Sequence, residues 1–200
     1  MWHLAGENPS IHLRQDLQRL TDELVGDRLG EQASAVSALC PVTPHEIEIA
    51  EAAVLGRSET FWFNCFEYAL EIADHPEAIA RIGTLYTSIF PNSEFMRLLL
   101  ETRLQPLPRS QVATGTLVLY LQGETVRHAG RVSADRIVSK WGTGHLWRHG
   151  LFEVPASYSD KVRFFRPLAR GEAIAGFIAY AELKLGHAVV AKVLGGLPAA

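Results

Sequence analysis

The sequence predicts an α+β protein, because helical and extended patterns occupy separate parts of the chain. Apolar residues recur at three- and four-residue spacing through most of the first 105 residues. From residue 114 to 166, short apolar runs alternate with a period of two. A helical pattern returns after Gly171. Helices followed by strands and a last helix favour segregated layers over alternating βαβ units.

The helical part begins with a stripe that starts after Ser10, a good N-cap, and ends near Gly26 or Gly30. After a loop, a second helix is predicted to start at Thr43-Pro44 and to stop at Gly56, because a capping residue precedes a proline at the first helical position. Three more helices are expected over residues 65–73, 77–90 and 93–104.

A mostly antiparallel sheet of four to six strands follows. Strands are expected at 117–121, 126–132, 136–141 and 162–166, with a short edge strand at 152–155. Residues 123–124 and 133–135 are predicted turns, and residues 171–194 form the last helix. We expect one compact domain with an N-terminal helical segment (1–56), a core (57–168) and a C-terminal helix (169–200).

Composition excludes several classes of protein. A chain of 200 residues with 48% hydrophobic residues buries about 70% of its extended surface, so the fold needs neither disulfides nor a structural metal. The formal charge of −3 and the four scattered lysines give no reason to expect a nucleic-acid partner. Charged residues interrupt the apolar stretch 173–197, so no membrane span is expected. The start lacks a signal peptide, which predicts a cytoplasmic protein unless a signal-independent route exports it.

Cys65 is the first candidate for chemistry. Asn64 is a good N-cap, which makes Cys65 the first residue of a helix, where free backbone N–H groups and the helix dipole favour a thiolate and lower the pKa. The alternative is that Cys65 is a small apolar residue in an aromatic-rich core. Cys40, followed by Pro41 and without a basic neighbour, is expected to be inert.

His128 is the second candidate. It lies on a predicted strand beside the small residues Ala129 and Gly130, which leave room for another backbone or a substrate near the imidazole. An earlier apolar strand follows Gly115-Thr116. The alternative is a core histidine whose hydrogen bonds are satisfied.

A cysteine at a helix start, a strand after a glycine and a strand with histidine, in this order, resemble the papain-like cysteine hydrolases of the CHAP and NlpC type. The resemblance covers about residues 61–166, although Gly115-Thr116 replaces the usual Gly-Asp pair. A Ser-Lys-Trp-Gly stretch before a last strand looks like a bacterial branch of this superfamily. The resemblance implies a papain-like core, Cys65 as nucleophile and His128 as base. The Cys65 N–H then becomes a candidate oxyanion donor.

The third catalytic residue depends on the turn that follows the His128 strand. A three-residue loop at 133–135 would place Lys140 opposite His128, whereas a two-residue turn at Ser133-Ala134 would place Ser139 there. Ser139 can accept a hydrogen bond from the imidazole, and a lysine ammonium cannot. His145, further along the chain, could also approach from its loop.

The substrate-binding candidates are Asn64, Trp141, His145, Trp147 and Arg148. Asn64 precedes the nucleophile, but as N-cap its side chain is committed to the helix amides. Trp141 and Trp147 could be the apolar walls of a substrate-covering loop with Arg148 as an anion clamp, or they could simply cover the sheet. His145 and His149 are spaced like zinc ligands, but flanking glycines argue against a helix and no third ligand is evident, so no metal and no cofactor are expected.

These observations predict a thiol hydrolase of the amidase or peptidase type that acts on peptide or protein amides through a thioacyl intermediate. A catalytically silent papain-like binding or interaction module is the alternative. A third hypothesis has the C-terminal helix docking a partner chain or a membrane surface.

Overall fold

A computed structural model of the chain describes residues 4–8, 10–51, 63–72, 82–86, 88–142 and 144–195. The helices are α1 (Ile11–Glu23), α2 (Leu29–Leu39), α3 (Cys65–Ala69), α5 (Ser93–Thr102), α6 (Arg170–Leu185) and α7 (His187–Gly195), and residues 82–86 are also helical. Short 3-10 turns are η1 (Gly26–Arg28), η2 (Arg109–Gln111) and η3 (Ala156–Tyr158). The strands are β1 (Glu48–Glu51), β2 (Pro106–Leu107), β3 (Leu117–Gln122), β4 (Thr125–Ser133), β5 (Arg136–Lys140), β6 (Leu146–His149) and β7 (Lys161–Phe165).

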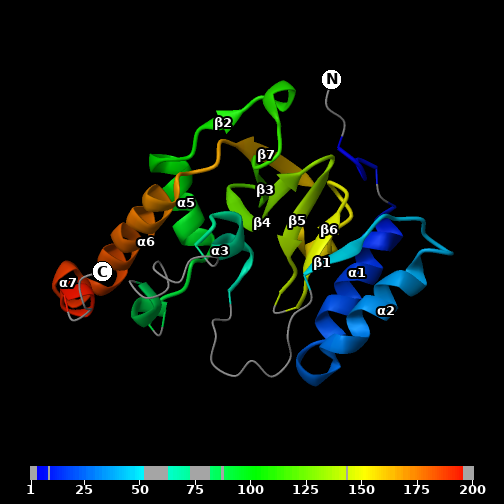
Figure 1. Cartoon of the computed structure of the whole chain (residues 1–200), viewed down its shortest axis with the longest axis horizontal. Coiled ribbons are helices and arrows are strands. Elements are labelled where there is room, and N and C mark those ends of the chain that lie inside the picture. The colour runs from blue at the N-terminus through cyan, green and yellow to red at the C-terminus, as the bar shows by residue number, and fades with distance from the viewer. Residues whose placement is uncertain are drawn as a thin grey trace.

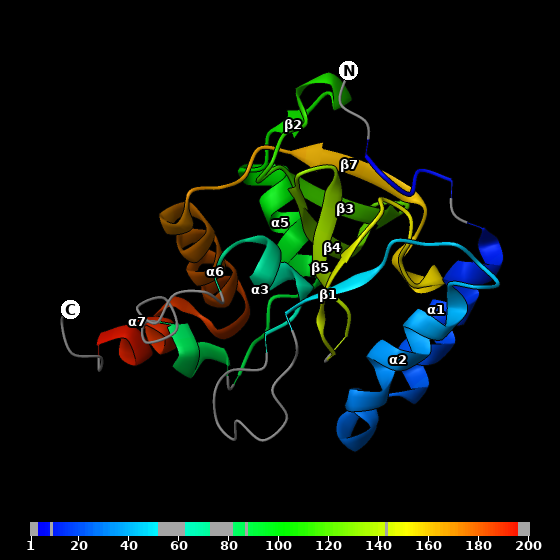
Figure 2. The same cartoon turned by 45° about the vertical axis from the view of Figure 1, so that its right-hand side comes forward.

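The strands form one antiparallel sheet in the order β1-β6-β5-β4-β3-β7-β2. Figures 1 and 2 show α1 and α2 on one side of the sheet and α3, α5 and α6 on the other. One core cluster joins Leu119 and Ala129 to α3, α5 and α6, and a second joins Val118 and Tyr120 to α1 and α2. The predicted α+β class and the antiparallel sheet are therefore confirmed.

Among the described residues the sheet has seven strands, more than the four to six predicted. One of the additional strands, β1, lies where a helix is expected, and another, β6, lies in the stretch considered as a substrate-covering loop. The helix expected from Thr43 is wrong as far as the chain is described, because residues 48–51 form β1 instead. Ile49 faces Trp147 and Glu48 faces Arg148, so cross-strand packing and an ion pair outweigh the local capping signal. The other part of that helix, after Glu51, lies outside the described residues.

Other boundaries also differ from the predictions. The edge strand expected at 152–155 is a turn held by hydrogen bonds from Leu151 and Phe152 to Ala5 and Gly6. Residues 29–39, expected as a loop, form α2. The helix from Cys65 ends at Ala69 instead of residue 73, and the C-terminal helix is divided into α6 and α7 at Gly186, whose φ is 89°. Of the helix predicted at 77–90, residues 82–86 are helical and residues 77–81 and 87 lie outside the described part.

Candidate functional site

Cys65 is the first residue of α3, as predicted, and Asn64 is its N-cap. The Asn64 side-chain oxygen accepts hydrogen bonds from the N–H groups of Phe66 and Glu67, at 2.9 and 3.1 Å. The Glu67 carboxylate accepts one from the Asn64 N–H at 2.7 Å, which completes a capping box. The Asn64 amide also donates to the Pro91 carbonyl at 2.7 Å. This side chain is therefore occupied in holding α3, and its proposed contact with substrate would have to break these bonds.

The ionisation of Cys65 is decided by burial. Burial raises the pKa of the thiol to about 12, and the nearby Glu67 charge acts in the same direction. The backbone amides of Ala129, Cys65 and Phe66 lower the pKa, but by less than burial raises it. The thiol is thus protonated near neutral pH, and the prediction of a lowered pKa is wrong for this conformation.

The Cys65 sulfur lies next to the part of β4 that no longer pairs with β5. Val132 donates its N–H to Thr116 on the β3 side, at 2.9 Å. Since successive amides of a strand alternate in direction, the Ala129 N–H points toward β5. The β4–β5 pairing ends at Arg131 and Val138, before it reaches Ala129. The Ala129 amide has no β5 partner there, and it lowers the pKa of the Cys65 thiol.

His128 is adjacent to Ala129 and is almost completely buried, with 1% of its surface exposed. It faces Tyr120 across β3 and β4, so its ring lies on the α1 side of the sheet, and it stacks on Tyr158 with ring centroids 3.9 Å apart and planes 8° apart. Its Nε2 atom has no hydrogen-bond partner among the described residues. Burial, aided by the nearby His149, holds the pKa of His128 well below its usual value, so the imidazole is neutral.

Cys65 packs with the core on the α3 side of the sheet, whereas His128 lies on the α1 side against Tyr158. The Tyr158 ring covers His128, and its hydroxyl accepts a hydrogen bond from the Gly142 N–H at 3.0 Å. Burial raises the pKa of Tyr158, and the charge of a Cys65 thiolate would raise it further. No sequence pattern indicates Tyr158, which lies in η3 between the strands expected at 152–155 and 162–166.

Neither register considered for the third catalytic residue is correct. The β4–β5 turn is the two-residue Ala134-Asp135, with Ala134 at a φ of 53°, and Ser133 faces Arg136. Ser139 therefore faces Trp147 on β6 and does not pair with His128. The Lys140 ammonium donates to the Gly144 carbonyl at 2.6 Å and lies 4.6 Å from the centre of the Phe63 ring. Ser139 and Lys140 are both held by partners other than His128.

Ser139 belongs to a buried hydrogen-bond chain that also contains His149. The Nδ1 atom of His149 lies 2.7 Å from the Gly150 carbonyl, which can only accept, so this nitrogen carries the proton. Burial lowers the pKa of His149 to about 4, so its Nε2 is an acceptor, and Ser139 donates to it at 2.7 Å. Trp141 in turn donates to the Ser139 hydroxyl at 3.2 Å. This series of hydrogen bonds joins β5 to β6.

The remaining substrate-binding candidates divide into buried and exposed residues. Trp141 and Trp147 are each 1% exposed and stack with centroids 5.0 Å apart, which supports the alternative that they cover the sheet. His145 is buried, with Nε2 3.1 Å from the Leu29 carbonyl. Arg148 is exposed and lines a groove of about 340 Å³ together with Arg131 and other residues.

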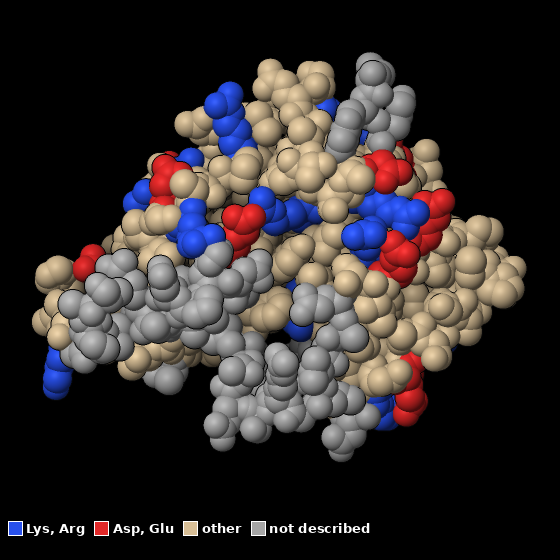
Figure 3. Space-filling view, viewed as in Figure 1, with Lys and Arg blue, Asp and Glu red and all other residues tan. Residues whose placement is uncertain are grey.

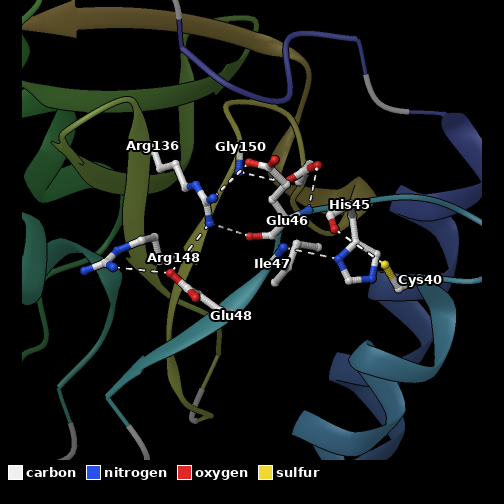
Figure 4. A network of polar contacts seen from close by, with 9 residues as sticks. Cys40, His45, Glu46, Ile47, Glu48, Arg136, Arg148 and Gly150 are labelled. Atoms are coloured by element: carbon white, nitrogen blue, oxygen red, sulfur yellow. Dashed lines mark hydrogen bonds and ion pairs between the residues drawn. The ribbon is translucent and has the colours of Figure 1, made fainter.

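Acidic and basic side chains lie next to one another on the face that Figure 3 shows. Arg148 pairs with Glu48 at 3.2 Å, and Arg136 pairs with Glu46 and Glu48 at 2.9 and 3.6 Å (Figure 4). These ion pairs connect β1 to β5 and β6. Arg148 is thus engaged by a carboxylate of the chain itself, which a substrate anion would have to replace.

A comparison of the chain with protein-family models, curated proteins and solved structures finds no match to any of them. Within the described ranges, no group of three or more histidine, cysteine, aspartate and glutamate side chains is placed to hold a metal ion. In the same part of the chain, none of the helices combines the length and the apolar character that crossing a bilayer requires.

Proposed function

We propose that the protein is a cysteine-dependent hydrolase of the amidase or peptidase type. Cys65 is the nucleophile and His128 the general base. The observation that carries this proposal is a buried His128 whose Nε2 has no described partner, on the same strand whose Ala129 amide lowers the pKa of the Cys65 thiol. Buried nitrogens are rarely left without a hydrogen bond, and such exceptions gather at functional sites.

The mechanism starts from a neutral pair. His128 accepts the proton of the thiol as the sulfur attacks the carbonyl carbon, so that charge develops only when substrate is present. While the proton leaves, the amides of Ala129, Cys65 and Phe66 stabilise the negative charge that develops on sulfur, and this charge passes to the carbonyl oxygen when the C–S bond forms. His128 gives the proton to the leaving amine, a thioacyl-enzyme remains, and water releases the acid.

The same residues support placing the core, 57–168, in the papain-like superfamily. The substrate class that follows is a peptide or protein amide. Tyr158 takes the place of the missing third residue, because a stacked ring fixes the imidazole plane where Ser139 and Lys140 do not.

A second candidate function is a catalytically silent binding module. The observation that favours it is the ionisation of both groups: a thiol with a pKa of about 12 and an imidazole with a lowered pKa form no resting ion pair. In that case Cys65 only completes the core between β4 and α3, and His128 only completes the core between β4 and η3.

Acylation by an activated ester separates the two functions. The protein is mixed with p-nitrophenyl acetate, and mass spectrometry locates the acetyl group. The hydrolase acylates Cys65 faster than the exposed Cys40, and His128→Gln lowers the Cys65 rate by about 100-fold or more, in the range of general-base contributions. Cys40→Ser is the matched control and leaves this rate unchanged. Cys65 acylation no faster than that of Cys40, and equal in folded His128→Gln, would establish the silent module.

A further inference from the structure

A groove of about 540 Å³ lies away from Cys65, between the first turns of α1, the β3–β4 hairpin and η3. Three cationic residues line it, namely Arg14, Arg127 and Lys161. Asp160 is the one acidic residue in its lining, so the groove carries an excess of two positive charges among its lining residues. The volume falls within the range of small-molecule sites, about 300–1,000 Å³.

A β-bulge places Arg127 at this groove. Tyr120 faces His128 and Leu121 faces Val126, so Arg127 is the extra residue that has no partner on β3. Bulges change the direction of a side chain and are frequent beside functional sites. The Arg127 side chain is exposed and forms neither an ion pair nor a hydrogen bond with the residues that the structure describes.

Arg14 is held in the wall of the groove without a carboxylate partner at hydrogen-bond distance. Its Nε donates to the Val154 carbonyl at 3.3 Å, and its Nη2 donates to the carbonyls of Ser159 at 2.7 Å and Ala156 at 3.4 Å. These carbonyls orient the guanidinium but do not neutralise it. The third nitrogen, Nη1, makes no hydrogen bond within the described ranges.

We infer that this groove binds a small soluble polyanion that carries phosphate or carboxylate groups. The backbone carbonyls hold the Arg14 side chain in place before a ligand binds, so this side chain loses little conformational entropy when its remaining N–H groups bind an anion. Arg127 and Lys161 approach from the hairpin and from β7, and together the three cations suit a ligand with at least two anionic groups. Asp160 disfavours any anion close to it, and its charge also acts on Arg14.

The site is independent of the proposed hydrolase, because neither Cys65 nor His128 lines the groove. It is nevertheless adjacent to the catalytic cluster along the chain. Arg127 precedes His128, and Ser157, another lining residue, precedes Tyr158.

Isothermal titration calorimetry with pyrophosphate and with citrate tests the inference on the full chain at low ionic strength. One of these probes should bind with a stoichiometry of one, and the stronger probe identifies phosphate or carboxylate as the preferred group. The double variant Arg127→Gln/Lys161→Gln should weaken that binding at least about tenfold, since both residues are exposed and unpaired.

Arg163→Gln is the matched control. Arg163 lies on β7 two residues from Lys161 but lines a different groove, beside Phe165, so its loss removes one charge and leaves the site intact. This variant should bind the probe within about twofold of the wild type. Absence of binding of both probes at millimolar concentration would overturn the inference. So would an equal loss of affinity in Arg163→Gln and the double variant, because it would show attraction by net charge alone.

Discussion

Gly130→Ala probes the place where β4 and β5 separate. A Cβ atom at Gly130 would lie 2.8 Å from the Ile137 Cγ2, 2.9 Å from the Val138 carbonyl oxygen and 3.0 Å from the Ser139 Cβ. The Val138 oxygen is backbone and cannot rotate away, so β5 must move by roughly half an ångström to restore ordinary contacts. Overpacking of this kind costs about 1–3 kcal/mol.

Urea and thermal unfolding measure this cost. For a chain of this length, each kcal/mol lowers Tm by about 2–4 °C. Gly171→Ala is the matched control, because a Cβ there meets no atom within 4 Å and the residue lies in the first turns of α6. The control should be as stable as the wild type or more stable, by up to about 1 kcal/mol. A Gly130→Ala protein as stable as the wild type would refute the close approach of β5 to β4.

Three further predictions concern stability and pH. His149 has a pKa of about 4 in the folded protein against an ordinary 6.5, so the unfolded chain binds a proton that the folded protein does not. The free energy of unfolding should therefore fall by about 3 kcal/mol as pH drops from 6.5 to 4. Urea unfolding should show this slope in the wild type and a smaller one in His149→Gln. Burial raises the pKa of Glu67 to about 7, so the folded protein keeps a proton that the unfolded chain loses, and the free energy of unfolding falls as pH rises from 4.5 through 7. Glu67→Gln should flatten this fall. An unchanged dependence of stability on pH in Glu67→Gln would contradict a raised pKa at Glu67. Asn64→Ala removes the cap of α3 and should cost about 1–2 kcal/mol in the same assay, against no effect if α3 is held by packing alone.

The sequence predicted best the features that local chemistry determines. Asn64 and Glu67 form a capping box from residues three positions apart, so the helix start at Cys65 follows from the sequence itself. The small residues after His128 are predicted to leave room for another backbone or a substrate, and Gly130 does lie against the backbone of β5.

Features that depend on distant segments could not be derived in the same way. The pairing of β1 with β6 requires Arg148 and Trp147, about 100 positions from Glu48, and no local pattern records it. The pKa of the Cys65 thiol depends on how deeply α3 packs against β4, and the position of Cys65 at the start of a helix does not reveal this depth. A shift of one residue in the turn after β4 was enough to misplace both candidates for the third catalytic residue.

The pH dependence of Cys65 acylation tests the account most directly. If His128 takes the thiol proton during attack, the rate is constant from pH 7 to 9, because the imidazole is already neutral and the thiol still protonated. In His128→Gln only the rare thiolate reacts, and its rate should rise about tenfold with each pH unit. A wild-type rate that rises just as steeply would show that the imidazole takes no part.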